Sequence, residues 1–118
     1  LAAFSCNAED DIPPPTRQEE LAVLENYKET IENLAETSVC NESTECLSIA
    51  FGSKPCGGPW SYLVYSSSID TSQLELWVEE YNFLQSEFNQ RWGEVSDCST
   101  PIPPIDFSCE NNQCIPIY

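Results

Sequence analysis

Two stretches of the chain repeat apolar side chains at the spacing of an amphipathic helix. The first runs over residues 17–37, where apolar residues recur at three- and four-residue steps: Leu21, Leu24, Tyr27, Ile31, Leu34 and Ala35. Glutamates fall mainly between these positions. Thr16 and Glu19 have the T-x-x-E spacing of a capping box, which satisfies free amide groups where a helix begins. The pattern predicts one helix over residues 17–37 with a solvated acidic face; recognition of a partner is the alternative role for that face.

The second helical stretch follows Asp70, a residue type that caps helix N-termini. Apolar residues then recur at helical spacing before Gly93: Leu74, Trp77, Val78, Tyr81, Leu84, Phe88 and Trp92. Glycine just beyond the last apolar residue is typical of a helix end. The pattern predicts a second helix whose aromatic stripe packs in the core; a carbohydrate platform is the alternative reading of the same stripe.

Short runs of β-forming residues occupy much of the remaining chain. Residues 46–51 and 60–66 predict two strands joined by the loop 52–59, which is rich in glycine and proline. Residues 105–109 and 113–117 flank a turn-prone segment, Glu110-Asn111-Asn112, that can reverse the chain into a hairpin. Together these elements predict an α+β fold, with two amphipathic helices packed on a small antiparallel sheet of three or four strands.

Seven cysteines in 118 residues indicate a disulfide-stapled domain, and such bonds persist in an oxidising compartment. Cys6 stands apart, and the other six form an even set: Cys40, Cys46, Cys56, Cys98, Cys109 and Cys114. We predict about three disulfides, one of them joining Cys56 to Cys98, with the other four cysteines paired among themselves. Zinc is the competing explanation, but the chain has no C-x-x-C pair and no histidine, so no metal site is predicted.

The charge balance excludes several classes of partner. Twenty acidic residues against four basic ones give a net charge of -16, which repels nucleic acids and anionic membranes. The charge serves solubility or, alternatively, complements a basic partner. The sequence contains no D-x-D-x-D-G loop for calcium. It also contains no run of about 18 apolar residues, the length that a membrane-spanning helix needs.

The residue types also argue against catalysis. Histidine is absent, which removes Ser-His-Asp and Cys-His arrangements. Nothing in the sequence marks a carboxylate pair in an apolar cleft, and no C-x-x-C redox motif is present. The chain is therefore predicted not to be an enzyme and to need no cofactor.

The segment Cys6-Asn7-Ala8-Glu9-Asp10-Asp11, followed by Pro13-Pro14-Pro15, resembles the mature start of surface lipoproteins from the Bacteroidetes group. That resemblance implies lipidation of Cys6, a tether over residues 6–15 and a location at the outer-membrane surface or outside the cell. Residues 1–5 would then be the remnant of a signal peptide or residues added for expression, and residues 16–118 one stapled domain. There are two alternatives for Cys6: it is an unpaired or intermolecular thiol, or it pairs with a cysteine outside this chain.

Cys40-x5-Cys46, Lys54-Pro55-Cys56-Gly57-Gly58-Pro59-Trp60, Ser96-Asp97-Cys98 and Cys109-x4-Cys114 together resemble a small secreted bacterial cysteine-rich domain of uncharacterised function. The resemblance implies one stapled domain and no activity. The proline and glycine residues between Lys54 and Trp60 also predict a bent, stiff loop. A possible binding loop therefore comprises Lys54, Pro55, Gly57, Gly58, Pro59 and Trp60, with a structural corner as the alternative.

The sequence favours a non-catalytic exported lipoprotein that serves as an accessory or interaction subunit at the bacterial outer-membrane surface. Its partner would be a protein, either an outer-membrane assembly or an extracellular protein, and its only contact with the membrane would be the lipid anchor. Two alternatives remain open. The loop from Pro55 to Pro59 could inhibit a secreted protease or another hydrolase, or Trp60, Trp77 or Trp92 could bind a glycan or other ligand weakly.

Overall fold

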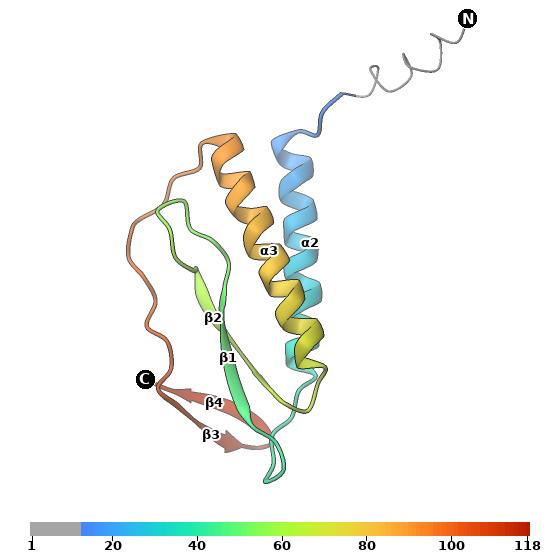
Figure 1. Cartoon of the computed structure of the whole chain (residues 1–118), viewed down its shortest axis with the longest axis vertical. Helices are drawn as coiled ribbons and strands as arrows, with labels where there is room; N and C mark the ends of the chain where they lie inside the picture. Colours follow the sequence, from blue (N-terminus) through green and yellow to red (C-terminus); the bar gives the residue numbers. More distant parts are fainter. Residues whose placement is uncertain (1–12) are drawn as a thin grey trace, which may run out of the picture.

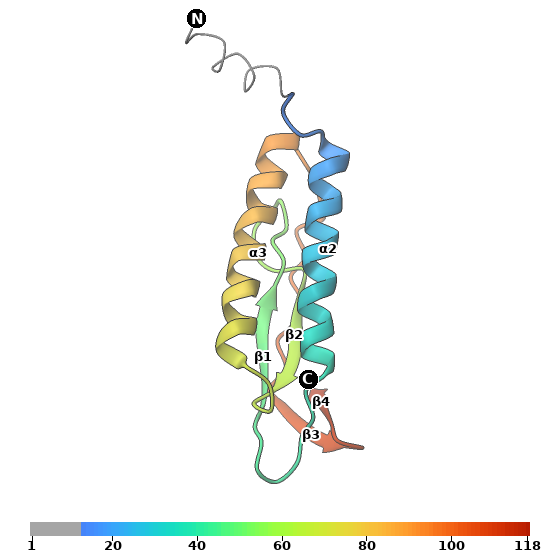
Figure 2. The ribbon, with the colours of Figure 1, turned by 90° about the vertical axis from the view of Figure 1, so that its right-hand side faces the viewer.

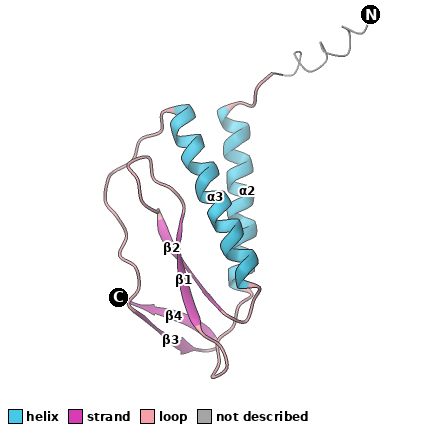
Figure 3. Ribbon diagram, viewed as in Figure 1, coloured by secondary structure: helices cyan, strands magenta, loops and turns pink. Residues whose placement is uncertain are grey.

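Two antiparallel helices and two β-hairpins form the domain in the computed structural model, which describes residues 13–118 (Figures 1 and 3). In chain order the elements are α2 (Arg17–Glu36), β1 (Cys46–Phe51), β2 (Ser61–Ser66), α3 (Thr71–Trp92), β3 (Asp106–Glu110) and β4 (Gln113–Ile117). The predicted α+β class, with two helices and up to four strands, is confirmed.

Local capping signals fix where both helices begin. At the start of α2 the predicted capping box is present: the Glu19 amide donates to Thr16 Oγ1 at 3.2 Å, and the Thr16 amide donates to Glu19 Oε1 at 2.9 Å. The Asp70 side chain accepts from the Gln73 amide at 3.1 Å at the start of α3. At its other end α3 is capped by Gly93 in the left-handed conformation, with φ of 61°, as the sequence predicts.

The core lies between the helix pair and one face of the β1–β2 hairpin (Figure 2). Alternation along the strands turns Leu47, Ile49 and Phe51 of β1 toward the helices, where Leu47 and Ile49 pair with Tyr65 and Leu63 of β2. The helices supply the rest of the buried cluster: Leu24, Ile31 and Ala35 from α2, and Leu74, Val78, Tyr81 and Phe88 from α3. The aromatic stripe of α3 therefore contributes mainly to the core.

The four strands form two separate two-stranded sheets rather than one continuous sheet. The second hairpin, β3–β4, turns at Asn111 and Asn112, whose φ angles of 52° and 64° are the positive values that a tight two-residue hairpin turn requires. Rather than by ladder hydrogen bonds, this hairpin is attached by disulfides to Cys46 of β1 and to Cys40 in the segment after α2, where the Cys40 amide also donates to the Asn112 carbonyl oxygen at 2.9 Å.

Three disulfides connect segments that are distant in sequence. They join Cys40 to Cys109, Cys46 to Cys114 and Cys56 to Cys98. The predicted Cys56–Cys98 bond and the mutual pairing of the other four cysteines are confirmed. Cys6, with the predicted remnant 1–5 and most of the tether, lies outside the described residues.

After α3 the chain returns along the side of β1–β2 that faces away from the helices, which brings β3–β4 to the far end of the domain (Figure 1). The Cys56–Cys98 bond ties the start of this return segment to the loop between β1 and β2. Within residues 13–118, no helix is apolar enough over its length to cross a bilayer.

Candidate functional site

Lys54, in the loop between β1 and β2, is a buried cation whose hydrogen bonds are satisfied inside the domain. Its side chain is only 5% exposed, and Nζ donates to Asp97 Oδ1 and to the Ser99 carbonyl oxygen, both at 2.7 Å. The ammonium group also lies 4.8 Å from the centre of the Trp60 ring. The hydrogen bond from Lys54, with two more from Ser99, lowers the pKa of Asp97 to about 2. Lys54 is therefore a structural tie between two segments rather than an exposed contact.

The tip of the same loop is closed on itself. The Lys54 amide donates to the Gly58 carbonyl at 2.9 Å, and the Gly57 amide donates to the Lys54 carbonyl at 2.8 Å. Gly57 and Gly58 have φ angles of 102° and 81°, which side chains rarely adopt. The side chains of residues 55–59 are limited to two prolines, a disulfide-bonded cysteine and two glycines, so the tip offers a target enzyme few side-chain contacts. The geometry favours the structural corner over the inhibitory loop.

Three polar residues of α3 hold this loop, and the sequence reading did not single them out. Asn82 Oδ1 accepts from the Gly52 amide at 2.6 Å, and Gln85 Oε1 accepts from the Ser53 amide at 2.5 Å. Asn89 Nδ2 donates to the Ser53 carbonyl at 2.8 Å. A detectable signal was present, because polar residues at positions 82, 85 and 89 form a stripe at helical spacing beside the apolar one.

The structure does not bring the three tryptophans together into a ligand platform. Trp60 lies on the loop and is 46% exposed, whereas Trp77 and Trp92 pack against the core cluster. Trp77 and Trp92 are 15 residues apart on α3, or about 22 Å along the helix axis. Trp92 Nε1 also donates to Glu20 Oε1 at 3.2 Å. A glycan site would have only Trp60 as an exposed ring from this set.

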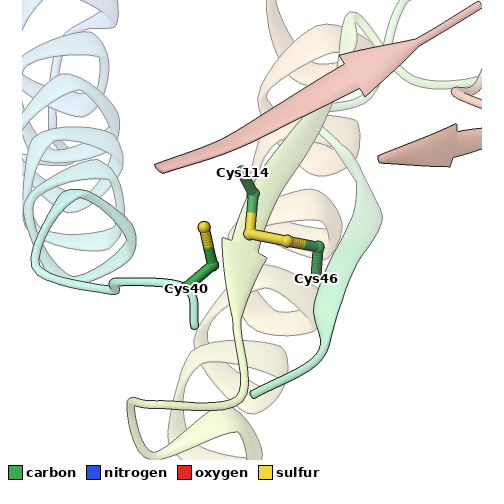
Figure 4. Close-up of side chains that lie close together, drawn as sticks. All are labelled: Cys40, Cys46 and Cys114. Atoms are coloured by element: carbon green, nitrogen blue, oxygen red, sulfur yellow. A yellow bond between two sulfur atoms is a disulfide. The ribbon is translucent and has the colours of Figure 1, made fainter. Parts of the chain in front are cut away.

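Two disulfides lie side by side where the β3–β4 hairpin meets the rest of the domain. The Sγ atoms of Cys40, Cys46 and Cys114 all lie within 4.8 Å of one another (Figure 4). Metal-binding cysteines need thiolate sulfurs, whereas Cys46 and Cys114 are bonded to each other and Cys40 to Cys109. This group is therefore a pair of neighbouring disulfides that staples the hairpin.

A hollow lies beside these disulfides, between the end of α2 and strands β2 and β4. It has a volume of about 530 Å³ and is lined by Ala35, Glu36, Ser38, Val64, Tyr65, Gln113 and Cys114. Its hydroxyl groups already have partners: Ser38 Oγ donates to the Ala35 carbonyl at 2.7 Å, and the Tyr65 hydroxyl donates to Glu75 Oε2 at 2.7 Å. These hydroxyls are therefore engaged in the structure of the domain.

A mainly apolar pocket of about 290 Å³ opens between α2 and α3. We call it the helix groove; its lining residues are Pro15, Glu19, Glu20, Val23, Leu24, Leu84, Glu87, Phe88 and Arg91. On α3, positions 84, 87 and 91 lie roughly on the opposite side of the helix from positions 82, 85 and 89, at about 100° per residue. Since the second set binds the β1–β2 loop, the groove opens away from that hairpin.

Carboxylates dominate the charge around the groove. Arg91 donates to Glu20 Oε1 at 2.5 Å. At the top of the helix pair, Arg17 donates to both oxygens of Glu94 at 2.9 and 2.7 Å, which lowers the pKa of that carboxyl group. With Lys54 paired to Asp97, three of the four basic side chains are thus engaged with carboxylates of the same chain.

An exposed apolar stripe extends the groove along α3. Leu76 and Phe83 are 60% and 61% exposed, and Val23 of α2, in the groove lining, is 63% exposed. Along α3, Leu76 is followed by Glu80 after four residues, by Phe83 after three more and by Glu87 after another four. This spacing places all four residues on one side of the helix. The sequence reading missed this stripe because it followed the stronger core-facing pattern of the same helix.

Comparisons of the chain with protein-family models, with curated proteins and with solved structures find no match.

Proposed function

We propose that this chain is an exported, non-catalytic domain that binds a protein partner through the helix groove and the adjoining surface of α3. The observation that carries the proposal is the apolar pocket of about 290 Å³ on the outward side of the helix pair, which Val23 lines. Val23 and Phe83, the residue before Leu84 of the lining, are each more than 60% exposed. Single exposed apolar residues are ordinary, but a concave apolar patch with a polar rim is typical of a protein-binding surface.

The electrostatics of the described carboxyl groups support a non-catalytic role. A carboxyl group that donates a proton near neutral pH needs a raised pKa, which burial in an apolar cleft provides. The carboxyl groups with shifted pKa values have lowered values instead. Hydrogen bonds from Thr16, Arg17 and Lys54 lower the pKa of Glu19, Glu94 and Asp97 respectively. The chain also lacks histidine.

The disulfides support export, and the N-terminal sequence supports an anchor. Three disulfides in a chain of this size fit an oxidising compartment. They use six of the seven cysteines, and we propose that Cys6 carries the lipid of an accessory subunit at the bacterial outer-membrane surface. Pro15 lines the helix groove. A chain from Cys6 to Pro15 reaches at most about 30 Å, so the groove would stay close to the membrane and to partners there.

Site-specific photo-cross-linking in the producing cells tests the proposed surface. A photoreactive residue replaces Phe83 in one variant and Ile105, which is 78% exposed and lies outside the groove lining, in a control variant. We expect a discrete cross-linked protein at position 83 and none at position 105. If position 83 gives no cross-link, or if both positions give the same products, the helix groove is not the binding surface.

Intact-mass analysis of the protein from its native envelope tests the anchor separately. A lipidated Cys6 predicts loss of residues 1–5 together with the added mass of acyl chains. An unmodified Cys6 would refute the lipid anchor and leave the proposed binding surface untouched.

A further inference from the structure

The apolar stripe beside the helix groove has the form of a surface that a third helix covers. Leu76, Glu80, Phe83 and Glu87 repeat at four-, three- and four-residue steps, which is the spacing that presents one side of a helix to a neighbouring helix. α2 already packs along another side of α3, through contacts such as Tyr27 against Tyr81 with ring centres 6.0 Å apart. The stripe therefore offers a second helix-packing side of α3.

The dimensions of the surface limit what can cover it. The stretch from Leu76 to Glu87 spans 11 residue steps, or about 16 Å along the helix axis and three turns. The pocket volume of about 290 Å³ is roughly twice that of a cavity that holds benzene. A segment of about three helical turns, with one aromatic or two aliphatic side chains in the pocket, would fit this surface.

The charge of the surface determines the chemistry of the segment. Glu19 and Glu87 are exposed residues of the groove lining. Glu80 lies between Leu76 and Phe83 on the stripe, where its Oε1 accepts a hydrogen bond from the Tyr27 hydroxyl of α2 at 3.2 Å and its other oxygen is left for a partner. Arg91, the basic residue of the lining, is already paired with Glu20. Complementary charge has to come from the partner. A second copy of this chain would instead bring another net charge of -16.

Resting on the proposed function, we infer that the partner presents a basic amphipathic helix to this surface. Its apolar side chains enter the pocket and cover Phe83 and Val23, and its lysine or arginine side chains pair with Glu80 and Glu87. Apolar burial supplies the affinity, while the charges speed association and select against acidic partners.

A fluorescently labelled helical peptide of about four turns, with leucines on one side and lysines elsewhere, is the probe for this inference. Two control peptides accompany it: a scrambled peptide of the same composition, and the same helix with glutamate in place of lysine. We expect binding of the first peptide only, and weaker binding as salt is raised because the charges are exposed.

Variants of exposed residues locate the contact without disturbing the core. We expect Phe83→Ser to weaken binding of the probe about tenfold or more, as truncation of a central apolar contact does, while Ile105→Ser leaves it unchanged. Glu87→Lys should weaken binding about fivefold, through the lost ion pair and added repulsion. Glu110→Lys, which makes the same change of net charge on the exposed end of β3, is its matched control.

Three results would overturn the inference: equal binding of the scrambled peptide, equal loss in the Phe83 and Ile105 variants, or equal loss in the Glu87 and Glu110 variants. The first and third results would mean that total charge governs binding, and the second would mean that the apolar contact does not lie on this surface. Mapping the segment cross-linked at position 83 separates the two proposals. An acidic or non-helical segment would refute the basic helix and leave the binding surface standing, whereas the absence of any cross-link would refute both.

Discussion

The two neighbouring disulfides, Cys40–Cys109 and Cys46–Cys114, should back each other up. Removing either one alone should cost less stability than then removing the other as well. With Cys46–Cys114 intact, Cys40–Cys109 closes only a small ring, made of the seven residues from Cys40 to Cys46 and the six from Cys109 to Cys114. A ring of about 13 residues contributes about 3 kcal/mol in the chain-entropy relation. Once either bond is lost, the remaining one closes a loop with a sequence separation of 69 or 68, which contributes about 4 kcal/mol.

Urea unfolding of paired cysteine-to-alanine variants measures this difference. We expect a loss of about 3 kcal/mol for Cys40→Ala with Cys109→Ala, a similar loss for Cys46→Ala with Cys114→Ala, and about 7 kcal/mol for all four together. A loss of that size approaches the whole stability of a typical small domain. Free energies extrapolated to water are the quantities to compare, because a less cross-linked unfolded chain also changes the slope with urea.

The third disulfide provides the control. Cys56–Cys98 has a sequence separation of 42 and ties a different pair of segments, so its removal should cost about 4 kcal/mol. If removal of either neighbouring disulfide already costs as much as removal of both, the two bonds do not back each other up. The reasoning from ring size would then be wrong.

Three further predictions concern single side chains. Lys54→Met should raise the pKa of Asp97 from about 2 toward its ordinary value of 3.8, as followed by carboxyl NMR titration. Because the pKa is lowered in the folded state, the associated stability is present above the unfolded pKa and is lost as pH falls toward 2; the variant should lack this acid-dependent loss, and an unchanged pKa would contradict the reasoning. Burial raises the pKa of Tyr65, as it does for Tyr27 and Tyr81, so Tyr65→Phe should reduce the number of late-titrating tyrosines in an alkaline absorbance titration by one and cost about 1 kcal/mol of stability through the lost hydrogen bond; an unchanged number would contradict the assignment of Tyr65 to this group. Leu74→Ala, at a fully buried position, should cost about 2 to 5 kcal/mol in urea unfolding, whereas Leu76→Ala at the exposed stripe should stay within about 0.5 kcal/mol; equal losses would contradict the assignment of these two residues to the core and the surface.

Local signals in the sequence predicted the secondary structure closely. The capping residues Thr16 and Asp70 and the terminal Gly93 act within one helical turn, and both helices begin and end within a residue of the predicted bounds. Two strands differ by one residue: β2 begins at Ser61 rather than Trp60, and β3 runs over Asp106–Glu110 rather than over residues 105–109. For β2 the cause is tertiary, because the Trp60 amide donates to the Phe51 carbonyl at 3.1 Å to close the loop while its ring covers Lys54.

Features that depend on tertiary packing were harder to predict from the sequence. The sequence placed Cys40, Cys46, Cys109 and Cys114 in one group, but it could not choose among the three ways of pairing them. In the structure, Cys109 and Cys114 face each other across the β3–β4 hairpin and each bonds outward. That choice follows from how the hairpin docks on the rest of the domain.

The candidate binding surface was hidden for a related reason. A periodic pattern identifies the side of a helix that is most apolar, which on α3 is the side that forms the core. Leu76 and Phe83 fall on another side, and two isolated apolar residues carry little weight in a sequence. Only the position of α2 shows that Val23 lines one pocket with Leu84 and Glu87 of α3, which lie next to Phe83 and one turn beyond it on that helix.

The engagement of Arg17, Lys54 and Arg91 with carboxylates of the same chain also has a colloidal consequence. Because most of its few cationic side chains are paired in this way, the surface of the domain is almost uniformly anionic. Molecules of the protein therefore repel one another at neutral pH. Near pH 4.1, where the net charge vanishes, that mutual repulsion is lost. The pH of the surroundings, and not protein concentration alone, should therefore determine whether the protein stays in solution or precipitates.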